Sequence, residues 1–224
     1  MHHALIVSAQ PKWAAESGVS DMLTGLGLSV HEVHHLDVTA VSQYAIVVLH
    51  SATYRGAPHN RSEEPVAMPG AIVLASGIAP AERPAASVHL PEPITEASLS
   101  VVLAAAGYAL PLPTDEAILQ HVGDLVGCDA DIMAELVASL LATNRADQQT
   151  LADACAAGHW PDVRASAHRI KGTAHLVDAA ALAALSLRIE TLARQDDSET
   201  VRALMLLYMP AVAMLSQALA RLAA

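Results

Sequence analysis

The chain has 224 residues, enough for one large domain or two small ones. Its 12 lysine and arginine residues against 23 aspartate and glutamate residues give a formal net charge of −11, and no basic cluster stands out. These features argue against nucleic acids or anionic membranes as the main binding partners. Hydrophobic residues make up 53% of the chain, but only 3% of residues are aromatic, so alanine and leucine must fill much of the interior.

Compartment and redox state are indicated by what the sequence lacks. We find no apolar run that reads as long enough to span a bilayer, and no signal peptide. Cys128 and Cys155 are the only cysteines, and neither a C-x-x-C motif nor zinc-ligand spacing is present. We therefore expect a soluble, cytoplasmic protein with two reduced thiols.

The first half alternates short apolar runs with helical patterns. Continuous apolar runs at residues 4–7, 45–49 and 71–74 are typical of parallel strands buried on both faces, and weaker strand signals lie at 28–33 and 87–90. Helices are predicted at residues 13–26 and 94–106. This alternation predicts an open α/β sheet. A glycine-rich phosphate loop is absent, which disfavours a nucleotide site.

The second half lacks strand signals and reads as helical after the break at Pro111-Leu112-Pro113. Predicted helices begin near Thr114, Asp129, Trp160 and Asp178, and the last spans residues 201–222. Pro210 is expected to kink or interrupt that last helix. Four main antiparallel helices with short loops predict a helical bundle. We therefore expect an α/β domain at residues 1–108 and an all-α domain at residues 109–224.

The most informative segment is His168-Arg169-Ile170-Lys171-Gly172-Thr173. Apolar residues recur in steps of three and four and form one stripe of a helix: Val163, Ala167, Ile170, Ala174 and Val177. Polar residues follow the same steps on another face: Arg164, His168, Lys171 and His175. Gly172 costs the helix about 1 kcal/mol relative to alanine. That cost is explained if another molecule must approach closely beside the imidazole.

The pattern H-x-x-K-G, here His168, Lys171 and Gly172, resembles the signature of histidine-containing phosphotransfer (HPt) domains. The resemblance covers about the last half of the chain, including the helix pattern. It implies that His168 carries a phosphoryl group between the aspartates of two receiver domains, that Lys171 stabilises the phosphoryl oxygens and that Gly172 gives steric access. Magnesium would come from the partner receiver, and the chain itself would need no cofactor. Residues expected to dock the partner are Arg164, Arg169, Thr173 and His175.

The first half resembles a receiver domain whose reactive positions have changed. The strand at residues 45–49 ends in His50, where a receiver carries its phosphoaccepting aspartate. Ser8 and Ala9 follow the first strand in place of the acidic magnesium ligands. Glu92 stands in place of the receiver lysine, and Ser76 corresponds to the hydroxyl residue after the fourth strand. The resemblance therefore implies a trimmed, flavodoxin-like pseudo-receiver that neither accepts phosphate nor binds magnesium, and that serves docking or regulation.

Two segments of the first half depart further from a receiver. Residues 51–69 are too polar and proline-rich for a standard third helix, and residues 78–86 are too short for a normal fourth helix. The order pseudo-receiver then HPt resembles the C-terminal tail of a hybrid sensor histidine kinase. In such a parent the tail faces the cytoplasm, and it has no kinase activity of its own.

Two alternatives stay open. An HPt-like bundle can bind a kinase or response regulator without carrying phosphate. The chain also has 12 histidines, and His31, His34 and His35 with Glu32 or His50 are candidate metal ligands, although exposed polar residues on a strand and loop explain them more simply.

Overall fold

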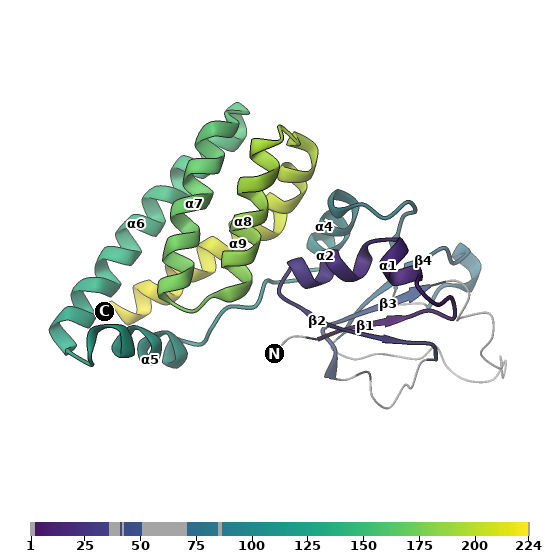
Figure 1. The fold of residues 1–224 in the computed structure, drawn as a ribbon, viewed down its shortest axis with the longest axis horizontal. Helices are drawn as coiled ribbons and strands as arrows, with labels where there is room; N and C mark the ends of the chain where they lie inside the picture. The colour runs from purple at the N-terminus through teal and green to yellow at the C-terminus, as the bar shows by residue number, and fades with distance from the viewer. Residues whose placement is uncertain (1–2, 36–40, 42, 51–70, 85–86, 224) are drawn as a thin grey trace. The chain divides into compact units, whose positions relative to one another are not determined.

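The structure is a computed structural model that describes residues 3–35, 41, 43–50, 71–84 and 87–223. The chain divides into two compact units, Met1–Tyr108 and Ala109–Ala224. Figure 1 shows an α/β unit followed by a helical one. The predicted class, α/β followed by all-α, is thus confirmed at this level.

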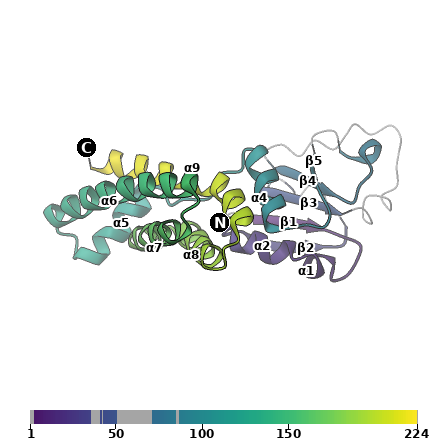
Figure 2. The ribbon, with the colours of Figure 1, turned by 90° about the horizontal axis from the view of Figure 1, so that it is seen from above.

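The described residues of the first unit form a sheet of five parallel strands in the order β2-β1-β3-β4-β5. They are β1 (His3–Val7), β2 (Ser29–Val33), β3 (Ile46–His50), β4 (Ile72–Ser76) and β5 (Val88–Leu90). This is the strand order of flavodoxin-like folds, and it places the topological switch point between β1 and β3. The helices α1, α2 and α4 lie on one face of the sheet (Figures 1 and 2).

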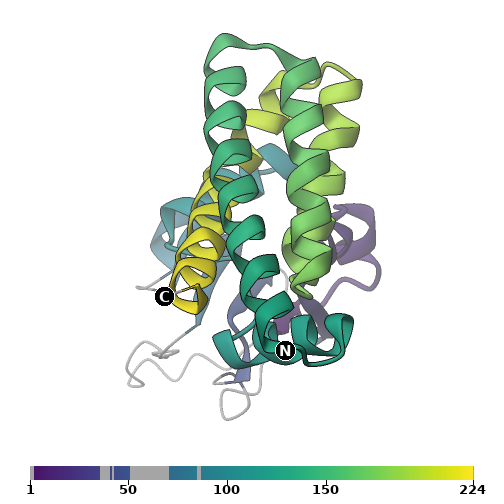
Figure 3. The ribbon, with the colours of Figure 1, turned by 90° about the vertical axis from the view of Figure 1, so that its left-hand side faces the viewer.

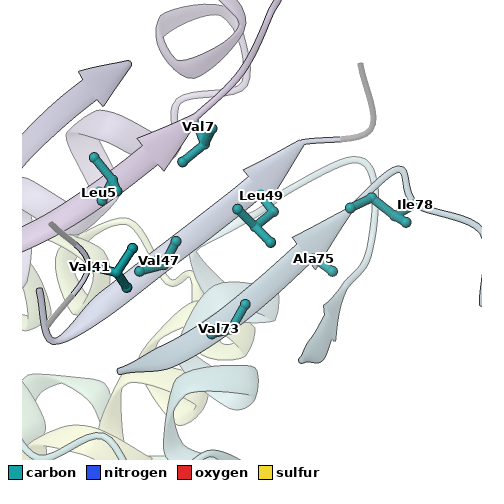
Figure 4. Packing of buried hydrophobic residues seen from close by; sticks show 8 residues of the cluster. All are labelled: Leu5, Val7, Val41, Val47, Leu49, Val73, Ala75 and Ile78. Atoms are coloured by element: carbon teal, nitrogen blue, oxygen red, sulfur yellow. The ribbon is translucent and has the colours of Figure 1, made fainter. Parts of the chain in front are cut away.

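The central strands are buried on both faces, as their continuous apolar runs predict. One face carries a cluster of buried side chains drawn in Figure 4: Leu5, Val7, Val41, Val47, Leu49, Val73, Ala75 and Ile78. Residues of the opposite parity, such as Ile6, Val48 and Leu74, are at most 1% exposed on the other face. The burial of both faces fixes the register of the sheet and thereby the positions of its strand ends.

The single helix predicted at residues 13–26 is wrong, because two short helices occupy this stretch. They are α1 (Trp13–Glu16) and α2 (Val19–Gly25). Gly18 separates them with a φ of 72°, a left-handed conformation that ends one helix and that glycine adopts without strain. A further helix of this unit, α4 (Glu96–Ala105), begins with a capping box between Thr95 and Ser98.

The connection between β4 and β5 is short, as predicted for residues 78–86. Between β4 and β5, the described residues hold one turn of 3-10 helix, η2 (Pro80–Glu82). The predicted irregularity of residues 51–69 lies outside the described residues. The Glu92–Pro93 peptide bond after β5 is cis.

The second unit contains α5 (Asp115–Val126), α6 (Ala130–Ala157), α7 (Trp160–Leu176), α8 (Ala180–Arg194) and α9 (Ser198–Leu222). Helix α7 packs against α6 and α8, and α9 packs against α6 and α8 (Figure 3). Asp129 caps α6 by accepting hydrogen bonds from the amides of Asp131 and Ile132, and Gly158 ends this helix with a φ of 69°. Asp178 was expected to begin the next helix, but it lies in the tight turn before α8 with a φ of 55°.

Helix α9 differs from expectation in two respects. It continues through Pro210 without interruption. Pro210 and Leu206, whose carbonyl loses its hydrogen-bond partner, are both exposed, so water can solvate that carbonyl. Among the helices of the described residues, α9 is also long and apolar enough to cross a membrane by length and composition, contrary to the prediction. However, 61% of its most apolar window is buried inside the structure, and a core helix passes the same test.

Candidate functional site

The site around His168 is created by the orientation of α7. The predicted apolar stripe of this helix is fully buried, with Val163, Ala167, Ile170, Ala174 and Val177 all at 0% exposure. Because His168 lies outside this stripe, its side chain points outward and is 68% exposed. The periodicity of α7 therefore presents the imidazole at the surface while the helix itself is anchored in the core.

A buried carboxylate on α8 holds the imidazole. Oε2 of Glu190 lies 3.3 Å from Nδ1 of His168, and the Glu190 side chain is only 7% exposed. Since a carboxylate accepts and does not donate, this contact makes Nδ1 the protonated nitrogen of the neutral ring. The lone pair then resides on Nε2, on the side of the ring away from Glu190.

Glu190 also pairs with Lys171, one turn after His168 on α7. Oε1 of Glu190 lies 2.6 Å from Nζ of Lys171, whose side chain is 20% exposed. A carboxylate this deeply buried requires a compensating charge and hydrogen bonds. Lys171 supplies the charge and His168 supplies the hydrogen bond. The three residues therefore form one cluster that spans α7 and α8.

Behind the cluster of His168, Lys171 and Glu190 lies a small polar core. The hydroxyl of Tyr208 is 2.7 Å from Oγ of Ser186, one turn before Glu190 on α8. Burial raises the pKa of Tyr208, and the nearby carboxylates Glu190 and Asp147 raise it further, so the phenol stays neutral. A neutral hydroxyl adds no competing charge behind the Glu190 carboxylate.

Gly172 lies on the same surface, and packing inside the second unit does not explain why this residue is a glycine. A Cβ atom built at this position meets no heavy atom within 4 Å. Packing within the unit therefore does not require glycine in this helix, although glycine costs about 1 kcal/mol relative to alanine. The open space above Gly172 adjoins the exposed imidazole.

The four predicted docking residues do not share one environment. Arg164 and His175 are exposed on the His168 side of α7. Arg169 is paired with α6 instead: its Nε donates a hydrogen bond of 2.5 Å to Oδ1 of the buried Asp147, while the Arg169 side chain itself is 46% exposed. Thr173 is 4% exposed and cannot offer a docking surface, because it falls among the buried positions of the helix.

A concave surface adjoins Lys171 between α7 and α8. Its volume is about 260 Å³, and four of its eight lining residues are alanines. The lining residues are Lys171, Ala174, His175, Asp178, Ala180, Ala183, Ala184 and Leu187. Leu187 is 54% exposed at its edge.

The residues that were compared with receiver positions lie at the carboxyl ends of the strands in the first unit. Oγ of Ser8 lies 3.1 Å from Nδ1 of His50, and Nε2 of His50 lies 4.0 Å from Oε1 of Glu92. Ser76 donates a hydrogen bond of 2.8 Å to the same Glu92 oxygen. Ala9 follows Ser8 at the end of β1. Ser8, His50, Ser76 and Glu92 are therefore neighbours at this edge of the sheet.

His50 is enclosed at this edge. It is 5% exposed and stacks on Trp13 with ring centroids 4.2 Å apart and planes 14° apart. Burial lowers the pKa of His50, and the charge of Glu92 partly opposes this shift. The ring is therefore neutral near pH 7.

The candidate metal ligands near β2 are dispersed. His31 makes edge-on ring contacts with His3 and Tyr44, whereas Nδ1 of His34 lies 3.0 Å from the carbonyl of Ser8. Within the part of the chain that the structure describes, no three His, Cys, Asp or Glu side chains are grouped to hold a metal ion.

Two functional candidates escaped the sequence analysis, Glu190 and Asp147. Each carries a signal in hindsight, since each places an acid among buried positions of an amphipathic helix. Glu190 follows Leu182 and Ser186 in steps of four, and Asp147 lies between the buried Asn144 and Leu151. An acid inside an apolar stripe indicates a cation on a neighbouring helix.

Comparison with curated proteins and with solved structures gave no match. A family model, described as Hpt domain, matches residues 135–224. The matched stretch runs from within α6 to the end of α9 and contains His168, Lys171 and Glu190. The match supports an HPt domain in this part of the chain, and such domains generally exchange phosphate with receiver domains.

Proposed function

We propose that the second unit is a phosphorelay intermediate of HPt type, with its helices forming the bundle of that family. His168 accepts a phosphoryl group from a receiver aspartate and passes it to the aspartate of a response regulator. The observation that carries this proposal is the exposed ring of His168, whose Nδ1 is occupied by the buried Glu190. An ordinary surface histidine needs no such support from a buried acid.

The contact with Glu190 sets both the tautomer and the angle of the ring. Nε2 of His168 attacks the phosphorus atom of an aspartyl phosphate, a nitrogen–phosphorus bond forms and the aspartate carboxylate leaves. The ring keeps its Nδ1 proton and becomes positively charged, and the negative charge of Glu190 stabilises that cation at 3.3 Å. Transfer to the next aspartate reverses these steps.

Lys171 serves the same reaction from the other side of Glu190. Phosphoryl transfer requires mainly positioning and charge stabilisation from the protein. Lys171 holds Glu190 in place through the 2.6 Å ion pair, and its ammonium lies one turn from His168, within the region where phosphoryl oxygens would arrive. The partner receiver supplies magnesium and the second carboxylate.

The partner receiver docks on the exposed face of α7. Gly172 admits its loops, Arg164 and His175 contact its acidic pocket, and the alanine-lined hollow beside Lys171 takes an apolar side chain. Arg169 and Thr173 are removed from this docking set, because Arg169 is paired with Asp147 and Thr173 is buried.

The first unit is proposed to be a pseudo-receiver. Its strand order is flavodoxin-like, and at the carboxyl ends of its strands Ser8, His50 and Glu92 take the places of receiver aspartates and lysine. Magnesium prefers several carboxylate or carbonyl oxygens, and Ser8, Ala9 and Gln10 offer no carboxylate. We assign it a docking or regulatory role within the cytoplasmic tail of a hybrid sensor histidine kinase.

The test is phosphoryl labelling of the full chain from a phosphorylated receiver and, separately, from a small-molecule phosphoramidate. Wild type is expected to acquire an acid-labile, base-stable label, and His168→Gln is expected to acquire none. His159→Gln, an exposed histidine directly before α7 to which no docking role is assigned, is the matched control and is expected to be labelled. Absence of label in wild type from every donor, with the helices folded, would favour the alternative of a non-catalytic interaction module.

The pseudo-receiver assignment has its own test. Addition of beryllofluoride and magnesium is expected to leave the amide NMR signals around His50 unchanged. Saturable shifts at Ser8, His50 and Ser76 would contradict it.

A further inference from the structure

We propose that the pocket at the carboxyl edge of the sheet in the first unit binds a small organic cation with a planar guanidinium head. The pocket has a volume of about 480 Å³ and lies between α1, the end of β3 and the segment after β5. It adjoins the switch point between β1 and β3, where open α/β sheets generally bind their ligands. Its volume is also within the range of small-molecule sites.

The charges that line the pocket select for a cation. Among the described residues that line it, Glu16 and Glu92 are charged, and none is a lysine or an arginine. Ser76 holds the Glu92 carboxylate through a 2.8 Å hydrogen bond, so the orientation of that carboxylate is fixed. A fixed, half-exposed carboxylate matches the paired N–H groups of a guanidinium.

The aromatic wall of the pocket favours the same ligand. Trp13 stacks on His50, and His50 is in turn 3.1 Å from Ser8, so the indole is held in one position. Guanidinium groups are attracted to the faces of indole rings. Because burial lowers the pKa of His50, the imidazole behind Trp13 adds no positive charge near pH 7 to oppose the ligand.

This site does not depend on phosphotransfer by the second unit. A receiver pocket that binds magnesium and phosphate needs several acids and one lysine, whereas this pocket offers an indole and two acids. A glutamate at position 92 in place of the receiver lysine therefore removes the affinity for phosphate and favours a cationic ligand instead.

The test uses butylguanidinium and its neutral isostere, butylurea, titrated into the full chain at low salt. Trp160→Phe leaves Trp13 as the sole tryptophan, and calorimetry on the unmodified chain gives a second measure. Butylguanidinium is expected to change Trp13 emission saturably, and butylurea to bind at least about tenfold more weakly. Equal binding of the two compounds, or no binding of butylguanidinium, overturns the proposal.

Matched variants separate the pocket from general attraction to an acidic protein. Glu92→Gln is expected to weaken binding of butylguanidinium about tenfold. Glu32→Gln removes one charge from exposed β2 in the same unit and is expected to leave binding unchanged. Equal losses in both variants, or none in Glu92→Gln, contradict the site. If Glu92→Gln does not fold, Trp13→Leu measured by calorimetry replaces it, with retained affinity overturning the proposal.

Discussion

The two units each pair an imidazole with a glutamate, and they do so in opposite ways. In the second unit the His168 side chain is 68% exposed and its partner Glu190 is 7% exposed. In the first unit the His50 side chain is 7% exposed and its partner Glu92 is 47% exposed. The exposed ring is presented to other molecules on a fixed carboxylate, whereas the buried ring supports the wall of a pocket. The burial of the ring, rather than the identity of the residues, decides which chemistry is open to each pair.

The strongest test of this comparison removes the fixed carboxylate of the second unit. Glu190→Ala frees Nδ1 of His168 and leaves Lys171 without its partner, so labelling from a phosphoramidate is expected to slow on the order of 10²-fold. Glu190→Gln keeps an acceptor for Nδ1 of His168, so its labelling rate is expected to fall less than that of Glu190→Ala.

The control for this prediction is Glu135→Ala, an exposed acid on α6. It is expected to be labelled at the wild-type rate. If Glu190→Ala were labelled as fast as Glu135→Ala, the proposed role of the buried acid would be wrong, even with His168 as the phosphoacceptor.

The same comparison shows how far sequence reasoning extends. Local periodicity predicted the buried stripe of α7 and hence the exposure of His168, because both follow from the helical repeat alone. The parallel sheet was also predicted, since buried strands read as continuous apolar runs. These features depend on residues close together in the chain.

The features that sequence missed depend on contacts between distant residues. Glu190 follows His168 by 22 residues in the chain, and Asp147 precedes Arg169 by 22 residues. Their pairing requires knowledge of which helix faces meet. The backbone turn at Gly18 was missed for a different reason, since the apolar pattern of residues 13–26 continues across it.

Arg169 and Arg164 test the difference between a structural and a docking cation. Arg169→Ala leaves the carboxylate of Asp147 buried and unpaired, so the free energy of unfolding is expected to fall by about 1–3 kcal/mol. Arg164→Ala is expected to leave stability unchanged but to slow transfer from a receiver several-fold, more strongly at low salt. Denaturant titration and transfer kinetics on both variants check this pair of outcomes, and a reversal would place Arg169 in the docking surface.

Gly172 separates access by a partner from the chemistry of the ring. Gly172→Ala is expected to stabilise the unit by up to about 1 kcal/mol, because the new methyl group has open space and alanine favours the helix. Transfer from a receiver is expected to slow, while labelling from a phosphoramidate stays near wild type.

Gly25→Ala supplies the control for Gly172→Ala, since a Cβ there also meets nothing within 4 Å. It is expected to leave transfer unchanged. If Gly172→Ala accepted phosphate from a receiver at full rate, the steric explanation for this glycine would fail.

The smallest expected effect concerns the buried imidazole, and it appears as a dependence of stability on pH. Burial holds the pKa of His50 in the folded state below its ordinary value of 6.5. Between these two values the unfolded chain binds more protons than the folded one, so stability rises with pH in that window. The contribution is fully present above pH 6.5 and is lost as the pH falls through 6.5 toward the lowered folded value.

His50→Gln removes this titration and is expected to flatten the dependence of the unfolding free energy on pH for the first unit between about pH 7.5 and 5. Glu92→Gln removes the charge that partly raises the pKa of His50, so it is expected to steepen the same dependence. Urea titrations at several pH values, read from Trp13 fluorescence in a Trp160→Phe background, measure both slopes. His168→Gln is the matched comparison, because its ring is exposed, and an equal flattening in that variant would contradict the contrast between the two pairs.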